Sequence, residues 1–299
     1  MAVALTVMDI SFTVVSDLRH EVGECPTWDE RRQMLLWASI TDGRIHALTP
    51  ATGQKQVWQF NGPVGSFGLC RTGRFVVALR DQVVLFDPET GRTETLATVA
   101  HAVDQMRFND GKVGPDGAFW VGSMDGRPAK EPIARLYRVD AAGRVGVIAE
   151  RLQVANGLAW DGDGTTMYFS DSRGPWVDAF DFEPTGGSVS HRRRFVTLST
   201  EAGRPDGATC DTDNCYWSAG PSASRLNRFS PAGELMAAID MPNFRPTMPC
   251  FGGPDFGTLY VTSLTEGLTA EQVEQHALAG KVLAFEAGAK GLPTHRFAD

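Results

Sequence analysis

Residues 74–91 read RFVVALRDQVVLFDPETG, two short apolar runs separated by a turn and closed by Asp-Pro-x-Thr-Gly. Short runs rich in Val, Leu and Phe, bounded by turn residues, predict paired β-strands. The same layout of strand, turn, strand and closing turn recurs along the chain, in six copies at residues 35–53, 74–91, 118–143, 166–182, 214–233 and 258–285. The copies begin about 40–50 residues apart, which is the period of four-stranded propeller blades.

The repeat predicts an all-β fold, a six-bladed β-propeller with four-stranded blades around a central channel. No change in composition suggests a linker, so we expect one domain over residues 1–299. The N-terminal stretch at about 6–15 alternates like a strand without a nearby partner, and we expect it to close the last blade. Residues 269–276 are the best candidate for a short helix. A generic β-sandwich, or a pair of them, is the alternative fold.

The composition is that of a soluble globular protein, with 299 residues, 42% hydrophobic and 21% charged. A net charge of −8 argues against a nucleic-acid partner, and no stretch approaches the length of a membrane span. The five cysteines form no CxxC pair, so we expect reduced thiols in the cytoplasm. The apolar N-terminus has no Lys or Arg before Arg19, so no signal peptide is expected. A monomer or a small homo-oligomer is expected.

Three distant segments place an oxygen-bearing side chain in a similar Gly or Pro setting. They are Glu24 in GECP, Asn156 in ANGL and Asp206 in PDG, and each begins a segment with the repeated layout. In equivalent blades of one ring these side chains converge on the axis. Two carboxylates and an amide oxygen suit a divalent metal with room for water and substrate. The alternative is that they are ordinary turn residues, since Asn-Gly and Asp-Gly are common turn pairs.

Five motifs resemble the senescence marker protein/regucalcin/gluconolactonase family, and the resemblance covers nearly the whole chain. In chain order they are GECPTW at 23–28, RFNDGK at 107–112, NG at 156–157, PDG at 205–207 and CFGGP at 250–254. The resemblance implies a six-bladed propeller with one divalent metal at the mouth of its channel. By motif position it puts the metal ligands on Glu24, Asn156 and Asp206, and substrate contacts on Arg107 and Asn109. It further implies hydrolysis of sugar lactones; a few relatives hydrolyse phosphotriester-like esters.

The sequence departs from the family pattern at three places. Cys25 stands where a Gly usually follows the metal-binding Glu. Ser39 ends the Trp37-Ala38-Ser39 stretch, where the family commonly has Asp. The segment 122–126, GSMDG, offers Asp125 and Gly126 but no Glu near the position at which some relatives bind substrate. These differences predict a substrate preference unlike that of the animal members.

Opening a lactone, a cyclic ester, requires a polarised carbonyl, an activated water and stabilisation of the oxyanion. A divalent metal can polarise the carbonyl, and Asp206 can act as general base toward water as well as metal ligand. Arg107 and Asn109 share one side of a strand, being two residues apart, and can donate hydrogen bonds to the sugar and the oxyanion. The alternatives are a structural ion pair for Arg107 and a turn cap for Asn109.

Other catalytic patterns are weak or missing from the sequence. The histidines show no metal-binding spacing, and no GxSxG, P-loop or GxGxxG motif occurs. Arg173, Arg204 and Arg245 follow or precede predicted strands near the channel mouth, where they would favour a lactone that carries an acidic group. The alternative is that all three are ordinary surface arginines.

The sequence therefore predicts a cytoplasmic, metal-dependent lactonase that opens an aldonolactone (1,4 or 1,5) to its acid in carbohydrate catabolism. Two alternatives stay open. One is an esterase or phosphotriesterase-type hydrolase with the same metal, and the other is a non-catalytic metal-binding regulatory propeller. The metal is one of Ca, Zn, Mn and Mg, and the ligand types do not choose among them.

Overall fold

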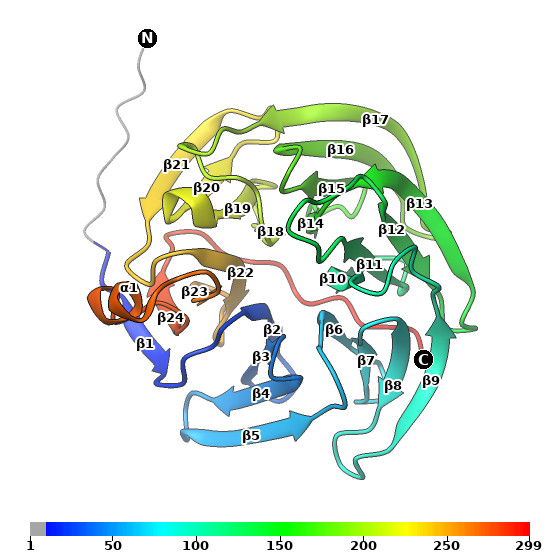
Figure 1. Ribbon diagram of the computed structural model, residues 1–299, viewed down its shortest axis with the longest axis horizontal. Helices are drawn as coiled ribbons and strands as arrows, with labels where there is room; N and C mark the ends of the chain where they lie inside the picture. Colours follow the sequence, from blue (N-terminus) through cyan, green and yellow to red (C-terminus); the bar gives the residue numbers. More distant parts are fainter. Residues whose placement is uncertain (1–9) are drawn as a thin grey trace.

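Six four-stranded antiparallel sheets are arranged in a ring in the computed structural model, which describes residues 10–299 (Figure 1). The predicted six-bladed β-propeller is confirmed. Each sheet is one blade, and in the first five blades the strand that comes first in the sequence lies innermost (Figure 1). In the last blade β1, at Thr13–Ser16, pairs with β24. The earliest part of the strand expected at about 6–15, residues 6–9, lies outside the described residues.

The blades follow the chain in order, and only the last one combines strands from both ends of the chain. Blade one comprises β2 (Gly23–Asp29), β3 (Met34–Ser39), β4 (Arg44–Thr49) and β5 (Gln54–Gln59). Blade two comprises β6 (Ser66–Leu69), β7 (Phe75–Ala78), β8 (Gln82–Phe86) and β9 (Thr93–Thr98). Blade three comprises β10 (Arg107–Val113), β11 (Phe119–Met124), β12 (Ala134–Val139) and β13 (Val145–Leu152). Blade four comprises β14 (Ala155–Trp160), β15 (Thr166–Asp171), β16 (Trp176–Glu183) and β17 (Ser188–Thr197). Blade five comprises β18 (Ala208–Cys210), β19 (Tyr216–Gly220), β20 (Arg225–Phe229) and β21 (Leu235–Asp240). Blade six comprises, from the axis outward, β22 (Pro246–Gly252), β23 (Thr258–Ser263), β24 (Val282–Glu286) and β1.

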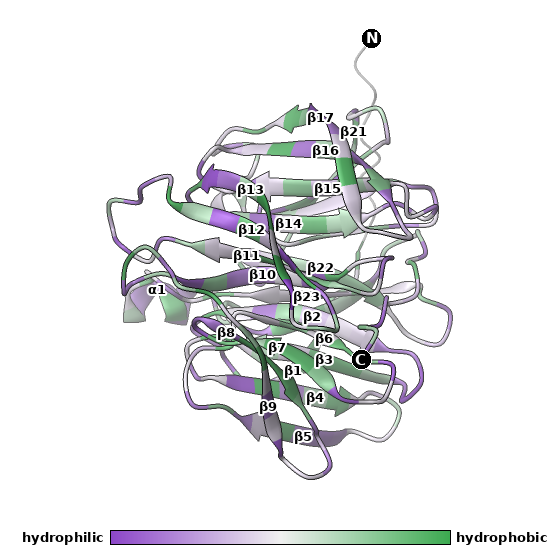
Figure 2. Cartoon of the chain, turned by 90° about the vertical axis from the view of Figure 1, so that its right-hand side faces the viewer, coloured by the Kyte–Doolittle hydropathy of each residue, from purple (hydrophilic) through white to green (hydrophobic). Residues whose placement is uncertain are grey.

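Burial falls from the axis of the ring to its rim. The middle strand β7, FVVA, is buried at every residue and is uniformly apolar in the side view of Figure 2. The outer strand β5, QKQVWQ, is mostly exposed. Inner and middle strands are covered by neighbouring blades on both faces, so they contain continuous apolar runs instead of a strict alternation. The core therefore lies between blades, as where Leu36 of blade one packs in one cluster with Phe67 of blade two.

The short helix α1 (Ala270–Gln275) lies in the loop between β23 and β24 of blade six, where 269–276 was predicted. Thr269 caps it, since its hydroxyl accepts from the Gln272 N–H while the Gln272 side chain accepts from the Thr269 N–H. The structure, over the residues it describes, contains no helix with the length and apolar character that a membrane crossing requires.

The C-terminal segment crosses the axis at the end of the ring opposite to the starts of the inner strands (Figure 1, red). Gly291 forms a bridge with Asp211 of blade five, and Phe297 forms one with Cys70 of blade two. These two blades stand opposite each other in the ring, so the residues between the bridges must pass over the axis. The segment is held firmly, because the Phe297 side chain is fully buried.

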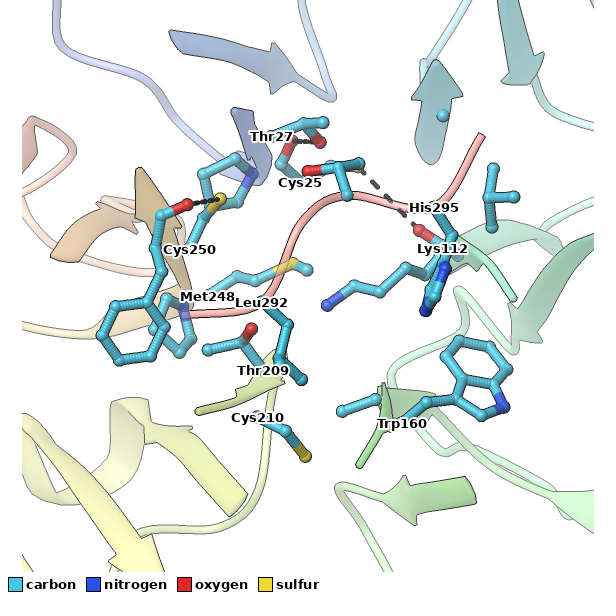
Figure 3. Close-up of a pocket in the computed structure, with 18 of the residues that line it drawn as sticks. Cys25, Thr27, Lys112, Trp160, Thr209, Cys210, Met248, Cys250, Leu292 and His295 are labelled. Atoms are coloured by element: carbon cyan, nitrogen blue, oxygen red, sulfur yellow. Dashed lines mark hydrogen bonds between the residues drawn. The ribbon is translucent and has the colours of Figure 1, made fainter. Parts of the chain in front are cut away.

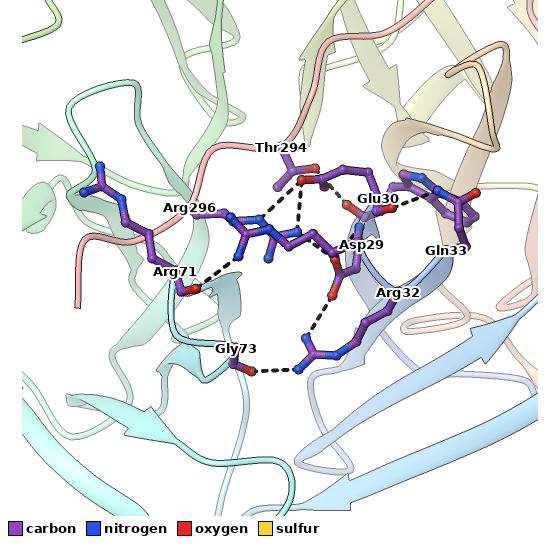
Figure 4. Close-up of polar contacts among 10 residues, drawn as sticks. Asp29, Glu30, Arg32, Gln33, Arg71, Gly73, Thr294 and Arg296 are labelled. Carbon is purple, nitrogen blue, oxygen red and sulfur yellow. Dashed lines mark hydrogen bonds and ion pairs between the residues drawn. The ribbon is translucent and has the colours of Figure 1, made fainter.

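An ion-pair network fastens this crossing segment to blade one (Figure 4). The Arg296 guanidinium lies 2.6 Å from Asp29 Oδ1 and 3.0 Å from Glu30 Oε1. Arg32 binds the other oxygen of Asp29 at 2.9 Å. Burial alone would raise the pKa of Asp29, but the hydrogen bonds from Arg296 and Arg32 lower it. Both Asp29 oxygens are bonded to an arginine, which offsets the cost of burying the carboxylate.

Candidate functional site

The side chains of Glu24, Asn156 and Asp206 belong to three inner strands at the end where those strands begin. Glu24 is the second residue of β2, Asn156 the second of β14, and Asp206 precedes β18 by two residues. We call this end of the ring the mouth. Glu24 and Asn156 are buried, at 7% and 4% exposure, while Asp206 is partly exposed. The ring thus brings together at its axis three residues that span more than 180 positions of the sequence.

A β-bulge follows two of these residues and explains how each side chain is aimed. The register of β2 shifts between Glu24 and Thr27, and that of β14 shifts between Asn156 and Ala159. The next residue is left-handed in both strands, with φ of 51° at Cys25 and 67° at Gly157. Bulges bend a strand and re-aim its side chains. Cys25 therefore adopts, at some strain, a conformation for which glycine is the natural choice.

An unbroken line of hydrogen bonds joins the side chains of blade three to those of blade four. Arg107 Nη1 donates to Asn109 Oδ1 at 2.9 Å. Asn109 Nδ2 donates to the Ala155 carbonyl at 2.9 Å and to Asn156 Oδ1 at 3.3 Å. Asn156 Nδ2 donates to Ser172 Oγ at 2.8 Å, so its amide oxygen is turned away from Ser172.

The line of hydrogen bonds separates the roles of Arg107 and Asn109. Both functional ends of the Asn109 amide are engaged within the protein, so this residue holds its neighbours in place. Arg107 uses one nitrogen, which donates to Asn109 and to the Phe108 carbonyl at 2.8 Å. A guanidinium carries five N–H donors, so others are left for a ligand. The two side chains lie side by side, as their spacing predicted.

Three carboxylates meet at the axis and repel one another. Burial raises the pKa of Glu24 well above its usual range, and the charges of Asp206 and Asp110 raise it further. Burial, with Asp110 next, raises the pKa of Asp206 to about 8. Burial lowers the pKa of Arg107, while the acidic groups nearby, Glu24 and Asp206 among them, oppose that shift. Bringing carboxylates together out of water is costly unless a cation accompanies them.

Asp110 is the member of this group that the sequence reasoning did not select. It lies in β10 beside Asn109, is 3% exposed, and accepts from the Leu158 N–H at 3.1 Å through Oδ2. Its Oδ1 is buried and has no partner among the described residues. The Asn109-Asp110-Gly111 sequence is typical of an exposed turn, so nothing in the sequence indicates that the Asp110 carboxylate is buried in a strand.

The donor set fits a hard cation only if the amide takes part. Among residues 10–299 no three His, Cys, Asp or Glu side chains are placed so as to hold a metal ion by themselves. In such a set Glu24 and Asp206 would supply carboxylate oxygens and Asn156 an amide oxygen. The unpartnered Oδ1 of Asp110 leaves negative charge nearby that a cation would offset. Oxygen donors with few protein ligands are typical of sites that keep water and substrate positions open.

Two departures from the family pattern have structural explanations. Asp125 is not free for a ligand, because its carboxylate accepts from Arg127 Nη2 at 2.8 Å and from the Glu131 N–H at 2.8 Å. Its side chain is fully buried, and hydrogen bonding to Arg127 lowers its pKa. Ser39 donates to Asp42 Oδ2 at 2.6 Å, so a carboxylate is still present at that strand end, three residues on.

The three arginines expected near the mouth differ in their surroundings. Arg173 is exposed, and only its main-chain N–H has a described bond, to Asp171 Oδ1 at 2.9 Å. Arg204 is half-buried and close enough to Asp206 to lower that pKa slightly. Arg245 donates to the Glu266 carbonyl at 2.6 Å. The expectation of cations at the mouth thus rests chiefly on Arg173 and Arg204.

A cavity of about 80 Å³ lies on the axis on the other side of Glu24 (Figure 3). Cys25, Lys112 and Cys250 line it, and the crossing segment, including Leu292 and His295, covers it. Lys112 Nζ donates to the Ala208 carbonyl at 2.7 Å. Burial raises the pKa of the Cys25 thiol to about 12 and that of Cys250 to about 11, so both stay neutral. Because the crossing segment covers this end of the axis, a ligand reaches the carboxylates from the mouth.

The chain is similar to one family model and to several known proteins. Residues 22–265 match the family model described as the SMP-30/gluconolactonase/LRE-like region. The chain is 39% identical to the 6-deoxy-6-sulfogluconolactonase of Pseudomonas putida, over 93% of this chain and 95% of that protein. It is 32% identical to regucalcin of Gallus gallus over 97% and 99% of the two chains. The crystal structure of regucalcin from Agrobacterium tumefaciens, described as a calcium-binding protein, superimposes with a TM-score of 0.90 at 26% identity, over 96% of this chain and 97% of that one. The chain belongs to the SMP-30/gluconolactonase/LRE-like family.

Proposed function

We propose that this chain hydrolyses a sugar lactone to the open-chain sugar acid, with a divalent metal held by Glu24, Asn156 and Asp206. The observation that carries the proposal is the meeting of buried, mutually repelling carboxylates with an amide oxygen at one open end of the ring. Such a site is unfavourable empty and suited to a hard cation. The predicted class of enzyme, a lactonase, is confirmed by the 39% identical relative, itself named a sulfogluconolactonase.

The residues divide the reaction between them. When bound, a divalent cation polarises the ester carbonyl and stabilises negative charge on its oxygen. Asp206 is the general base: it takes a proton from water as the water oxygen adds to the carbonyl carbon. The ester C–O bond then breaks, and the ring oxygen receives that proton and leaves as a hydroxyl. Arg107 donates its free N–H groups to the sugar and the oxyanion, and Asn109 keeps Arg107 and Asn156 in register.

The identity of the metal follows from ligand type only as a class. Three oxygen donors suit Ca²⁺, Mg²⁺ and Mn²⁺, and a site of this kind also accepts Zn²⁺. We favour Ca²⁺ as the first ion to test, since the solved relative is described as calcium-binding. We also place the enzyme in the cytoplasm and in carbohydrate catabolism; the five free cysteines agree with a reducing compartment.

The test is acid release followed with a pH indicator. Chelated protein and protein reloaded with each candidate metal are assayed on a panel of neutral and anionic sugar lactones. Asp206→Asn should abolish metal-dependent release, whereas Asp240→Asn, an exposed carboxylate of the same blade, should not change it. Turnover of simple esters or phosphotriesters without lactones would favour the second hydrolase class. Metal binding without any turnover would favour a regulatory propeller and overturn the proposal.

A further inference from the structure

Two loops at the mouth carry cations that the catalytic group does not use. The loop after β11 contains Lys130, and the turn after β15 contains Arg173. Both strands end at the mouth, since Met124 pairs with Arg107 and Asp171 pairs with Ala155 at the starts of the inner strands. Lys130 and Arg173 therefore lie above the line of hydrogen bonds that runs from Arg107 to Asn156.

Hydrogen bonds hold the two loops together. The Asp125 N–H donates to the Gln153 carbonyl at 3.1 Å, and the Gln153 N–H donates to Asp171 Oδ2 at 2.9 Å. Asp171 Oδ1 accepts from the Arg173 N–H at 2.9 Å. Lys130 Nζ donates to the Asp125 carbonyl at 2.6 Å. A buried carboxylate, that of Asp171, thus fixes the turn of Arg173 to the loop of Lys130.

The nearest carboxylates do not neutralise these cations. Asp125 is committed to Arg127 through both its oxygens, and Asp171 is used by main-chain N–H groups. In the described part of the chain neither Lys130 nor Arg173 forms an ion pair. Lys130 is bonded to two carbonyls, and its ammonium has a third N–H for a ligand.

The cations are also close enough to repel one another. Burial lowers the pKa of Lys130, the charge of Arg173 lowers it further, and Arg107 acts in the same direction. Asp125 and Glu266 oppose these shifts without cancelling them. Like charges held together by main-chain hydrogen bonds, and only partly offset by the exposed carboxylate of Glu266, are stabilised by a bound anion.

We propose that Lys130 and Arg173 form a subsite for an anionic substituent of the lactone. The substituent is a sulfonate, phosphate or carboxylate, which share a compact group of acceptor oxygens. This inference rests on the proposed lactonase function, because it assumes that the ester carbonyl faces Glu24 and Asp206. The anionic end then lies over blades three and four.

The test compares anionic with neutral lactones in the double variant Lys130→Met/Arg173→Gln. We expect KM for 6-sulfo-, 6-phospho- and 6-carboxy-lactones to rise about 10- to 100-fold for each charged hydrogen bond lost, with kcat little changed. Activity on the neutral glucono-1,5-lactone should stay within about twofold, since it makes none of these bonds. Differences among the three anions identify which group the subsite prefers.

Matched controls are Lys55→Met and Arg92→Gln, exposed cations at the opposite end of the ring. They should leave the preference for anionic lactones intact. Raising the salt concentration should raise KM for anionic lactones in the unaltered protein and have less effect in the double variant. An unchanged ratio of anionic to neutral activity in the double variant would overturn the subsite while leaving the lactonase in place.

A binding measurement separates this inference from the function on which it rests. If the metal-loaded protein opens no lactone, the proposed function fails, and calorimetry with 6-phosphogluconate and gluconate decides the subsite alone. Tighter binding of 6-phosphogluconate, lost in Lys130→Met/Arg173→Gln, would support an anion site. Equal binding of both acids would refute it.

Discussion

Gly157 stands beside the candidate ligand Asn156, and alanine there should destabilise the fold more than at any open turn. Its φ is 67°, and a Cβ at this position would lie 2.5 Å from Ser170 Oγ and 2.6 Å from the Tyr216 hydroxyl. The left-handed conformation costs an L-residue about 1–2 kcal/mol. Forcing extra volume into a packed core adds about 1–3 kcal/mol. We expect Gly157→Ala to lower the free energy of unfolding by about 2–5 kcal/mol in total.

Gly53→Ala is the matched control, since Gly53 has a φ of 71° and no atom within 4 Å of an added Cβ. Gly53→Ala should lower the free energy of unfolding only by the cost of the left-handed conformation, about 1–2 kcal/mol. Urea denaturation of both variants gives the difference, which isolates the clash at the site. The clash should also displace Tyr216, whose hydroxyl donates to the Gly157 carbonyl at 2.9 Å, and so weaken metal binding. Equal destabilisation by the two substitutions would refute the reasoning.

Three further results are expected. Metal uptake by the metal-free protein should release protons, because burial raises the pKa of Asp206 to about 8 and that of Glu24 well above its usual range. Below about pH 8 the apparent affinity for the metal should therefore rise about tenfold per pH unit for each proton released. A metal affinity that calorimetry finds independent of pH would contradict this. Cys25→Gly should change the free energy of unfolding by less than about 1 kcal/mol, because relief of the left-handed backbone strain offsets the lost thiol contacts. Cys25→Val should lower the free energy of unfolding by more than that. Denaturation curves in which the valine variant is more stable than the glycine variant would exclude the strain. Arg296→Leu should lower the free energy of unfolding by about 3 kcal/mol, because the buried Asp29 carboxylate loses one of its partners. The double variant Arg296→Leu/Asp29→Asn should recover part of that stability. Full stability of the single variant would count against the network.

The fold and the position of the site could be predicted because they depend on local sequence that repeats. Each blade carries its own strand and turn signals, so the ring follows from their period. The bulge that aims Glu24 and Asn156 is also local, a Pro or Gly within two residues of the ligand. The repeat position could therefore distinguish Asn156-Gly157 from an ordinary turn.

Features that depend on contacts between distant segments could not be predicted. Asp110 becomes a buried carboxylate only because Leu158 of the next blade covers it. The crossing of the axis by residues 291–297 depends on bridges to blades two and five, which no local pattern encodes. The hidden parts of the site are thus those whose partners come from another blade.

The charges at the mouth imply an order of binding. Glu24, Asp110 and Asp206 outnumber the two nearby arginines, Arg107 and Arg204, and Lys112 offsets Asp110 only from the cavity side. Without a metal and above about pH 8, where Asp206 is ionised, the axis repels the anionic lactone that Lys130 and Arg173 would attract. A divalent cation removes that repulsion, because it offsets the excess negative charge next to the ester carbonyl. Above that pH an anionic lactone should therefore bind after the metal, whereas a neutral lactone has no such electrostatic reason to wait.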